Sequence, residues 1–137
     1  MKDTSTHNFT DMDAPALKAS MDRFEGVCVV ATVNDDGTPN ASIFVPVMPD
    51  ESHIILILAG NRTRENIERM GIARLVYDVA DPKAEDKEAR AAGARLDLEL
   101  VKNEGSEAEE YQAVADSFPH MNPAVLIMRI KTILPVG

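Results

Sequence analysis

The feature that most constrains the fold of this chain is a series of six short apolar segments, most of them joined by connections of turn length. Val, Ile and Leu dominate these segments, and β-branched residues favour β-strands. Short turns join neighbouring strands in antiparallel fashion, whereas a doubly wound parallel fold needs a helix after nearly every strand. The pattern therefore predicts a mainly β protein with some α structure, in which a largely antiparallel sheet forms a closed or partly closed barrel. The six predicted strands are residues 27–33, 40–48, 53–59, 72–80, 94–102 and 124–133.

Turn residues and alternation give these strands their register. Asp36-Gly37 is a pair typical of hairpin turns. Pro46 cannot donate a ladder hydrogen bond, so we expect an edge or a bend near this residue. In residues 94–102, leucines alternate with charged residues, which indicates a strand with one buried face.

The remaining signals predict three helices. Asp13 and Asn61 are N-cap residues for the first two, and Ser106 with Glu109 forms a capping box for the third. Residues 81–93 are polar on nearly every side and predict a solvated loop or a short exposed helix. The predicted helices run from residues 13 to 26, 61 to 71 and 106 to 118.

Length and charge exclude several classes of protein. The chain has 137 residues, which favours one compact domain, here residues 13–137 after a mobile N-terminal segment of residues 1–12. A net charge of −9 argues against nucleic-acid and anionic-membrane partners. No apolar run approaches the roughly 20 residues that span a bilayer, and the polar start resembles no signal peptide. We therefore expect a cytoplasmic protein.

The core is expected to be small and poor in rings. Aromatic residues make up 4% of the chain, and there is no tryptophan. Small domains with such cores often gain buried area by dimerising. The single cysteine, Cys28, lies among valines and is expected to pack as a small hydrophobic residue.

The segment AGNRTRENIERM, residues 59–70, gathers basic and hydroxyl groups where a strand passes into a helix. With Asn61 as N-cap, Arg62, Thr63 and Arg64 occupy the first helical turn, whose backbone N–H groups have no helical partner. The helix dipole adds partial positive charge there. Together with the Arg62 guanidinium and the Thr63 hydroxyl, these groups make up a phosphate cradle. Arginine opposes the dipole at this position, so two arginines cost stability unless an anion binds.

A second interpretation of the same segment is a solvated helix face. Arg64 can pair with Glu68 on the helix surface, and Glu65 can pair with Arg69. Arg62 would then be one more solvated charge. The sequence has neither of the commonest glycine-rich nucleotide loops, so this segment alone leaves both interpretations open.

No other group of residues indicates catalysis or metal binding. His7, His53 and His120 lie far apart and form no metal-ligand spacing. His120 has the best claim to a site, because it lies in the segment PHMNP and loops of this kind often line sites. No Ser-His-Asp or Cys-His pattern has local support, so we assign neither a catalytic residue nor a metal ligand.

The order of three segments resembles the FMN-binding split-barrel family, which is related to pyridoxamine 5′-phosphate oxidase. The segments are VCVVATVNDDGTPNASIFVPV, HIILILAGNRTRENIERMGIARLVYDV and GARLDLELV, and the resemblance covers roughly residues 25–133. Its most specific parts are the DGxP hairpin and the [KR]T-x-x-N segment, here Arg62, Thr63 and Asn66. The resemblance implies a six-stranded, largely antiparallel split β-barrel with flanking helices, in which residues 13–137 bind FMN.

The resemblance also implies a homodimer with FMN at the subunit interface. It places the FMN phosphate on Arg62 and Thr63 and the flavin ring along residues 42–44. It brings residue 59 close to the cofactor, and it supplies the segment SFPHMNP from the partner subunit. The residues thereby assigned to the cofactor are Ser42, Ile43, Phe44, Ala59, Asn61, Arg62, Thr63, Asn66 and His120.

The implied function is that of an FMN-dependent oxidoreductase, in which the flavin carries out the redox chemistry and the protein orients it. The alternative is a non-enzymatic FMN-binding electron carrier, and either would exchange electrons with a small-molecule or protein partner. A third interpretation keeps the fold and replaces FMN by a deazaflavin or haem. The true oxidases carry an extended C-terminal portion with basic residues, whereas this chain ends at KTILPVG, so oxidation of pyridoxamine phosphate itself is not expected.

Overall fold

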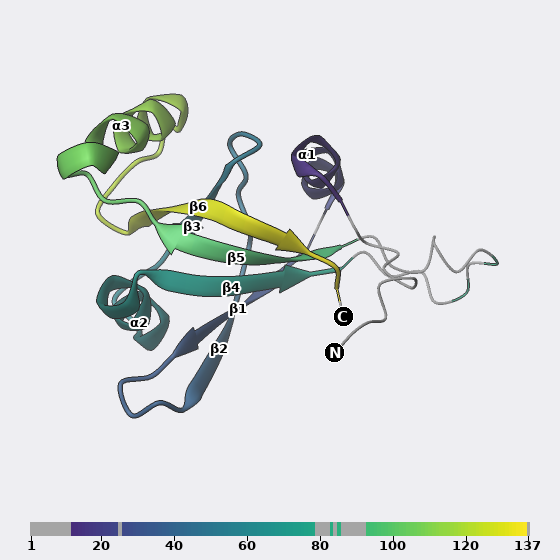
Figure 1. The fold of residues 1–137 in the computed structure, drawn as a ribbon, viewed down its shortest axis with the longest axis horizontal. Helices are drawn as coiled ribbons and strands as arrows, with labels where there is room; N and C mark the ends of the chain where they lie inside the picture. Colours follow the sequence, from purple (N-terminus) through teal and green to yellow (C-terminus); the bar gives the residue numbers. More distant parts are fainter. Residues whose placement is uncertain (1–11, 25, 79–82, 84, 86–92, 137) are drawn as a thin grey trace.

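A computed structural model describes residues 12–24, 26–78, 83, 85 and 93–136 of the chain. In this part of the chain, six strands form one curled sheet that is flanked by three α-helices (Figure 1). The strands are β1 (Cys28–Val33), β2 (Pro39–Phe44), β3 (His53–Ile57), β4 (Ile72–Tyr77), β5 (Ala94–Leu100) and β6 (Val125–Leu134). The helices are α1 (Ala14–Arg23), α2 (Arg62–Met70) and α3 (Ala108–Ser117), with a short 3-10 helix, η3 (Gly105–Glu107), before α3. The predicted mainly β, six-stranded split barrel is confirmed.

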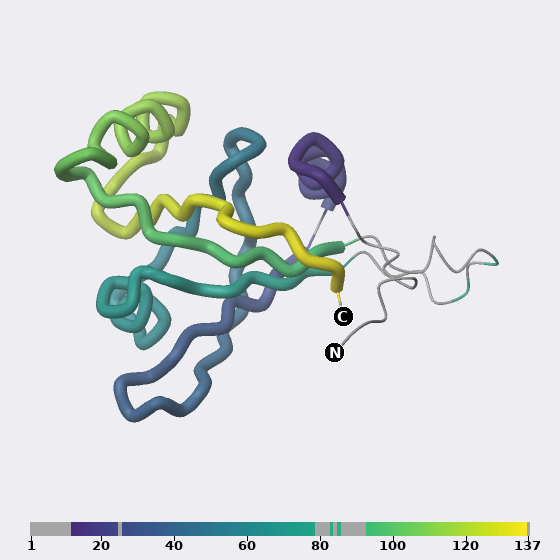
Figure 2. Tube along the Cα trace, viewed as in Figure 1, coloured from purple at the N-terminus to yellow at the C-terminus, as the bar shows by residue number. Residues whose placement is uncertain are grey.

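The sheet is antiparallel throughout and nearly closes on itself (Figure 2). Its strand order is β2-β1-β4-β5-β6-β3, so β2 and β3 lie at its two edges. Beyond β2, Val47 forms an isolated bridge with Ile55 of β3, whose N–H donates to the Val47 carbonyl at 2.8 Å. The predicted bend is confirmed, because β2 ends at Phe44, just before Pro46. The barrel is therefore split along this line.

A β-bulge interrupts the pairing of β5 with β6. Leu98 is paired with Ile130, but Asp97 is paired with Thr132, so Lys131 is the extra residue on β6. As a result, Ile130 and Ile133 both pack against the interior core although they are three positions apart. Without the bulge, strict alternation would turn one of them to the other face.

The interior of the curled sheet holds the main core. Every second residue of the strands points inward, and the helices add Leu17 and Met21 from α1 and Ile67 from α2. Figure 1 shows α2 beside the start of β4 and α1 away from it, so the two helices contribute to this core from different places. The fully buried strand residues of this core include Val30, Ile54, Leu56, Leu75, Leu96, Leu98 and Met128.

A smaller core lies on the other side of β3 and β6, beneath α3. Ile54 belongs to the interior core, whereas its neighbour Ile55 packs with Val114 of α3, as alternation along a strand requires. Tyr111, Val114, Ala115 and Phe118 are spaced as on one face of a helix, and all four pack in this second core. The predicted capping box is wrong. Ser106 lies inside η3, and no side-chain hydrogen bond caps η3 or α3.

Element ends differ from the predictions where tertiary contacts decide them. The first helix ends at Arg23, before the predicted Gly26, and strands β3 and β5 each end two residues early. The limits of α2 are as predicted, with Asn61 as N-cap and Gly71 in the left-handed conformation at φ 73°. The predicted mobile segment lies outside the described residues apart from Met12, which packs against the interior core. Most of the polar segment 81–93 also lies outside them.

No helix in the described part of the chain has the length and apolar character needed to cross a membrane.

A cluster of charges attaches α3 to the sheet. Glu110 of α3 accepts hydrogen bonds from Arg129 of β6 at 2.6, 3.0 and 3.2 Å and lies 2.6 Å from Nε2 of the buried His53. The Arg129 guanidinium, with a smaller contribution from His53, lowers the pKa of Glu110 to about 2. The carboxylate form of Glu110 thus holds the helix in place.

We predict that the Glu110→Gln variant is less sensitive to acid than the wild type. Because folding lowers the pKa of Glu110, its stabilisation is present above the ordinary value of 4.5 and is lost as pH falls toward about 2. The free energy of unfolding of the wild type should therefore fall more steeply in this range. Urea titrations at several pH values measure it, with Glu109→Gln, on the exposed side of α3, as the matched control. Equal slopes for the wild type and Glu110→Gln would contradict the prediction.

We predict that Cys28→Ser destabilises the protein and that the native thiol is unreactive. Cys28 is 1% exposed, and burial raises the pKa of its thiol to about 11, so the neutral thiol dominates at pH 8. A hydroxyl at this apolar position should cost about 1–3 kcal/mol of unfolding free energy. Urea unfolding and the rate of thiol labelling at pH 8 measure these two effects. Labelling of the folded protein as fast as a free thiol would show that this interpretation is wrong.

Candidate functional site

The first turn of α2 presents unpaired backbone donors. The Asn61 side chain accepts a hydrogen bond from the Arg64 N–H at 2.9 Å, and the Asn61 carbonyl accepts from the Glu65 N–H at 3.1 Å. The N–H groups of Arg62 and Thr63 have no hydrogen-bond partner among the described residues. They lie at the positive end of the helix dipole, where an anion is favoured.

Arg62 is the cation of this turn that remains available. Its side chain is exposed and forms no hydrogen bond or ion pair with any residue that the structure describes. Besides the Thr38 side chain, the positive charge of Arg62 also lowers the pKa of Asp36, in the turn between β1 and β2. There the Thr38 side chain is the main cause that lowers the pKa of the carboxyl, and Arg62 contributes less. Arg62 is therefore free to bind an anion beside the helix start.

Arg64 and Arg69 are occupied within the protein. The expected pair of Arg64 with Glu68 is present, whereas no pair of Glu65 with Arg69 is found among the described residues, and both arginines make further contacts. Arg64 donates to the carbonyls of Leu58 at 2.9 Å and Pro123 at 2.7 Å, and its Nε lies 3.5 Å from Glu68. Arg69 donates to the Asn66 side chain and to the carbonyl of residue 33. The reason is tertiary, because both carbonyl partners of Arg64 and the partner of Arg69 on β1 come from outside the helix.

Asn66 joins α2 to β1. Its side chain is fully buried, and its Nδ2 donates to Thr32 Oγ1 at 3.0 Å and to Asn34 Oδ1 at 2.9 Å. Its Oδ1 accepts a hydrogen bond from Arg69 at 3.0 Å. Both amide hydrogens and the amide oxygen are thus paired, which is what a buried amide requires.

Thr63 and Ser42 extend this contact to β2. Asn40 Nδ2 donates to Thr32 Oγ1 at 3.2 Å and to Thr63 Oγ1 at 3.1 Å, and Ser42 Oγ lies 2.6 Å from Thr63 Oγ1. Thr63 is 1% exposed, whereas Ser42 is half-buried. We call Thr32, Asn34, Asn40, Ser42, Thr63 and Asn66 the hydroxyl–amide network. It fixes the start of α2 against the β1–β2 hairpin.

The predicted ring-contacting residues of β2 point in two directions. Ser42 lies on the side of α2, and Phe44 packs against the interior core. Ile43 lies on the opposite face and is 65% exposed. Neighbouring side chains of a strand lie on opposite faces. A planar group on one face of β2 would therefore contact the side chain of Ser42 or that of Ile43, but not both.

The structure brings the segment that contains His120 close to the start of α2 in the same chain. Arg64 donates to the Pro123 carbonyl, and Leu58 N–H donates to the Ala124 carbonyl at 2.7 Å. His120 itself is exposed and contacts Phe118 edge-on, with ring centroids 5.9 Å apart. Ala59 and Asn61 are exposed between β3 and α2. No signal in the sequence predicts the contact of Arg64 with Pro123, because the two residues are 59 positions apart.

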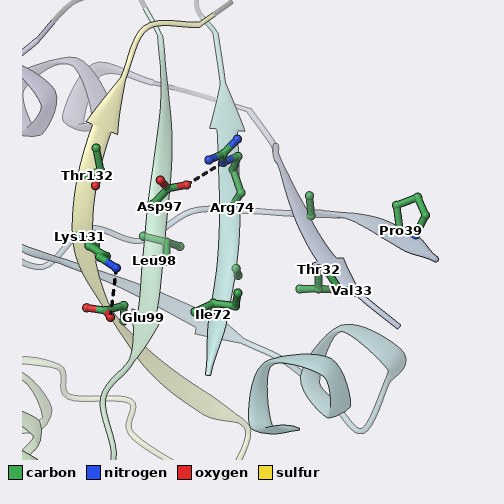
Figure 3. A pocket seen from close by; sticks show the side chains of 12 residues that line it. Thr32, Val33, Pro39, Ile72, Arg74, Asp97, Leu98, Glu99, Lys131 and Thr132 are labelled. Atoms are coloured by element: carbon green, nitrogen blue, oxygen red, sulfur yellow. Dashed lines mark hydrogen bonds and ion pairs between the residues drawn. The ribbon is translucent and has the colours of Figure 1, made fainter. Parts of the chain in front are cut away.

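A groove of about 690 Å³ lies on the outer face of the sheet (Figure 3). Residues of β1, β4, β5 and β6, together with Pro39 of β2, line it, and Val33 and Ile72 supply apolar side chains. Two ion pairs cross it, Arg74 with Asp97 at 2.7 Å and Lys131 with Glu99 at 4.0 Å. Sequence reasoning missed this groove, although β1 is apolar on both faces and thereby carried a signal for it.

The arrangement of strands and helices matches several solved structures. A search of protein-family models gives no match, and a search of curated proteins finds no similar sequence. An FMN-binding protein from Syntrophomonas wolfei superposes with a TM-score of 0.61 at 20% identity, over 92% of this chain and 89% of that chain. A pyridoxamine 5′-phosphate oxidase-like protein from Listeria innocua gives a TM-score of 0.56 at 13% identity, over 90% and 97%. This chain has the pyridoxamine 5′-phosphate oxidase-like split-barrel fold.

Split barrels of this kind hold more than one ligand. HutZ, a haem storage protein from Vibrio cholerae, superposes on this chain with a TM-score of 0.55 at 15% identity, over 92% of this chain and 96% of that chain. Proteins that share this fold thus differ in the ligands that they bind, and the fold alone identifies no ligand for this chain.

The chemistry available at the start of α2 is anion binding and hydrogen-bond donation. The site offers one free guanidinium, two backbone N–H groups and the Ser42 hydroxyl. These groups suit a phosphate, and redox chemistry at such a site would come from a bound cofactor.

Proposed function

We propose that the protein is an FMN-binding flavoprotein and that it acts as an FMN-dependent oxidoreductase. The observation that carries the proposal is the free Arg62 guanidinium beside the unpaired N–H groups of the first turn of α2. These residues fit a phosphate monoester, which takes a charge-assisted contact from arginine and further bonds from helix N–H groups. The FMN-binding protein that shares the fold supports the same ligand.

The residues of the chain would bind and orient the cofactor. Arg62 and the backbone N–H groups would hold the phosphate, and the edge of β2 at residues 42–44 would lie along the flavin. Because β2 is an edge strand, its outer backbone groups are available to a ligand. Bound FMN would supply hydride or electron transfer, and none of the site residues needs to act as an acid or a base.

A non-enzymatic electron carrier is the alternative form of the same proposal. It would use the same phosphate site and would pass electrons to a protein partner instead of turning over a small molecule. Oxidation of NADH or NADPH by the purified FMN-loaded protein distinguishes the two, because a carrier alone gives no steady-state turnover. A single buried thiol fits a reducing compartment, so we place either activity in the cytoplasm.

Haem is a second candidate ligand, favoured by one observation. His120 is exposed in a loop, and an imidazole of this kind is what haem iron takes as an axial ligand. HutZ supports this candidate by its fold. The visible spectrum of the purified protein separates the candidates, since haem, FMN and a deazaflavin absorb at different wavelengths.

We also propose that the functional unit is a homodimer formed through the outer face of the sheet. Val29, Val33, Ile43 and Ile72 are large apolar side chains on this face, and each is 38% or more exposed. The four charged residues of the groove cancel in pairs, so this face does not carry the repulsion expected from the net charge of −9. A second copy would cover the apolar surface.

We predict that Arg62→Ala weakens FMN binding about ten- to a hundred-fold. The variant removes a charge-assisted contact that contributes roughly 1.5–3 kcal/mol. Riboflavin lacks the phosphate, so its weaker binding should be indifferent to the substitution. Titration followed by flavin fluorescence measures both affinities.

Arg23→Ala is the matched control for this experiment. Arg23 is also an exposed arginine, but it ends α1, which lies away from α2 (Figure 1). The Arg23→Ala variant removes the same charge and should leave the affinities for FMN and riboflavin unchanged. If Arg62→Ala weakens the binding of FMN and of riboflavin equally, or weakens neither, the proposed phosphate site is wrong.

We predict that Ile72→Glu shifts the protein from dimer to monomer. The buried charge would oppose docking of a second copy on the outer face. Ile57→Glu, on the edge strand β3, is the control, because Ile57 is 51% and Ile72 is 49% exposed. Sedimentation at micromolar concentration should give twice the 15.0 kDa chain mass for the wild type and the control, and the chain mass for Ile72→Glu. A monomeric wild type would contradict the proposal.

A further inference from the structure

The hydroxyl of Thr63 must find its acceptor inside the protein. The side chain is 1% exposed, and a buried donor without a partner costs about 1–3 kcal/mol. Asn40 Nδ2 already donates to Thr63 Oγ1 at 3.1 Å, so this contact uses the oxygen and leaves the hydrogen. Among the described residues, the remaining hydrogen-bond neighbour of Thr63 Oγ1 is Ser42 Oγ, at 2.6 Å. Thr63 therefore donates its hydrogen to Ser42.

The Asn40 bond of the hydroxyl–amide network agrees with this assignment. Arg69 is always a donor, and its bond to Asn66 Oδ1 at 3.0 Å makes the Asn66 nitrogen a donor toward β1. Asn40 Nδ2 lies between two threonine oxygens, at 3.2 Å from Thr32 and 3.1 Å from Thr63, and gives one hydrogen to each. The Asn66 hydrogens thus end at Thr32 and Asn34, while one hydrogen of Asn40 ends at Thr63, so the branch from Asn40 through Thr63 leads to Ser42.

The hydrogen of Ser42 is then left for a ligand. A hydroxyl has a single hydrogen, and Ser42 Oγ receives that of Thr63. Ser42 is half-buried and lies against the first turn of α2, on the side where the free N–H groups are. Its hydrogen is therefore directed out of the network at the place where an anion would bind.

We propose that Thr63 is a positioning residue and that Ser42 donates to an oxygen of the bound phosphate. This inference rests on the FMN site proposed above and changes the role of the Thr63 side chain. Thr63 contributes its backbone N–H to the anion, while its buried hydroxyl fixes the direction of the Ser42 hydroxyl. The ligand group that Ser42 recognises is an oxyanion, which only accepts hydrogen bonds.

A double-mutant cycle with FMN tests this role. Ser42→Ala and Thr63→Val should each weaken FMN binding about ten-fold, because each removes one oriented donor to a charged group. The double variant should be no weaker than either single variant, since Thr63 acts through Ser42. Thr63→Ser keeps the hydroxyl and should bind FMN as the wild type does. Riboflavin affinity should be the same in all the variants.

Three results would overturn the inference while the wild type still binds FMN. An additive loss of about a hundred-fold in the double variant would mean that Thr63 contacts the phosphate directly. An unchanged affinity in Ser42→Ala would mean that the Ser42 hydrogen points inward. A parallel loss of riboflavin affinity would mean that the variants act on packing, and thermal unfolding of each variant checks its fold. A wild type that binds no FMN would overturn the proposed function itself and this inference with it.

Discussion

The buried amide of Asn66 is the interaction on which the candidate site depends. Its three hydrogen bonds reach β1 and Arg69, and through Thr32 they continue to Asn40, Thr63 and the edge strand β2. A buried amide is stable only while all these bonds are made, because each unpaired group costs free energy that water would otherwise supply. The start of α2 is therefore held against the hairpin by hydrogen bonds, and the loss of any one of them would leave a buried polar group unpaired.

The three arginines of α2 differ in whether the protein itself provides their hydrogen-bond partners. Arg64 and Arg69 are taken up by backbone carbonyls and Asn66, while Arg62, in the first turn, has no partner among the described residues. On the other side of the sheet, Arg129 is shared among Glu99, Glu107 and Glu110. In a chain with a net charge of −9, a lone cation beside unpaired N–H groups is an exception to this pattern. It is the feature on which the proposed anion site rests.

The sequence predicted what local chemistry decides and missed what distant contacts decide. Asn61 and Gly71 fix the limits of α2 through capping and the left-handed conformation, both of which are properties of the residues themselves. The grouping of hydroxyl and basic residues at this helix start was also visible in the sequence. The partner of Arg64 at Pro123 was not, and neither was the inward turn of Thr63, because both depend on how the sheet curls. The capping box at Ser106 failed because a 3-10 turn preceded the helix. Whether the predicted residues bind FMN stays a prediction.

The bulge in β6 has a consequence for how this chain should be compared with others. Ile130 and Ile133 are spaced as on one face of a helix. A prediction that assumes strict alternation would therefore end the strand between these two residues. In a strand that lacks the extra residue, the inward-facing positions would match those of β6 on both sides of the bulge only if a one-residue gap were placed at Lys131. At identities near 20%, such a phase change weakens a comparison of sequences, whereas a match of folds in three dimensions does not depend on it.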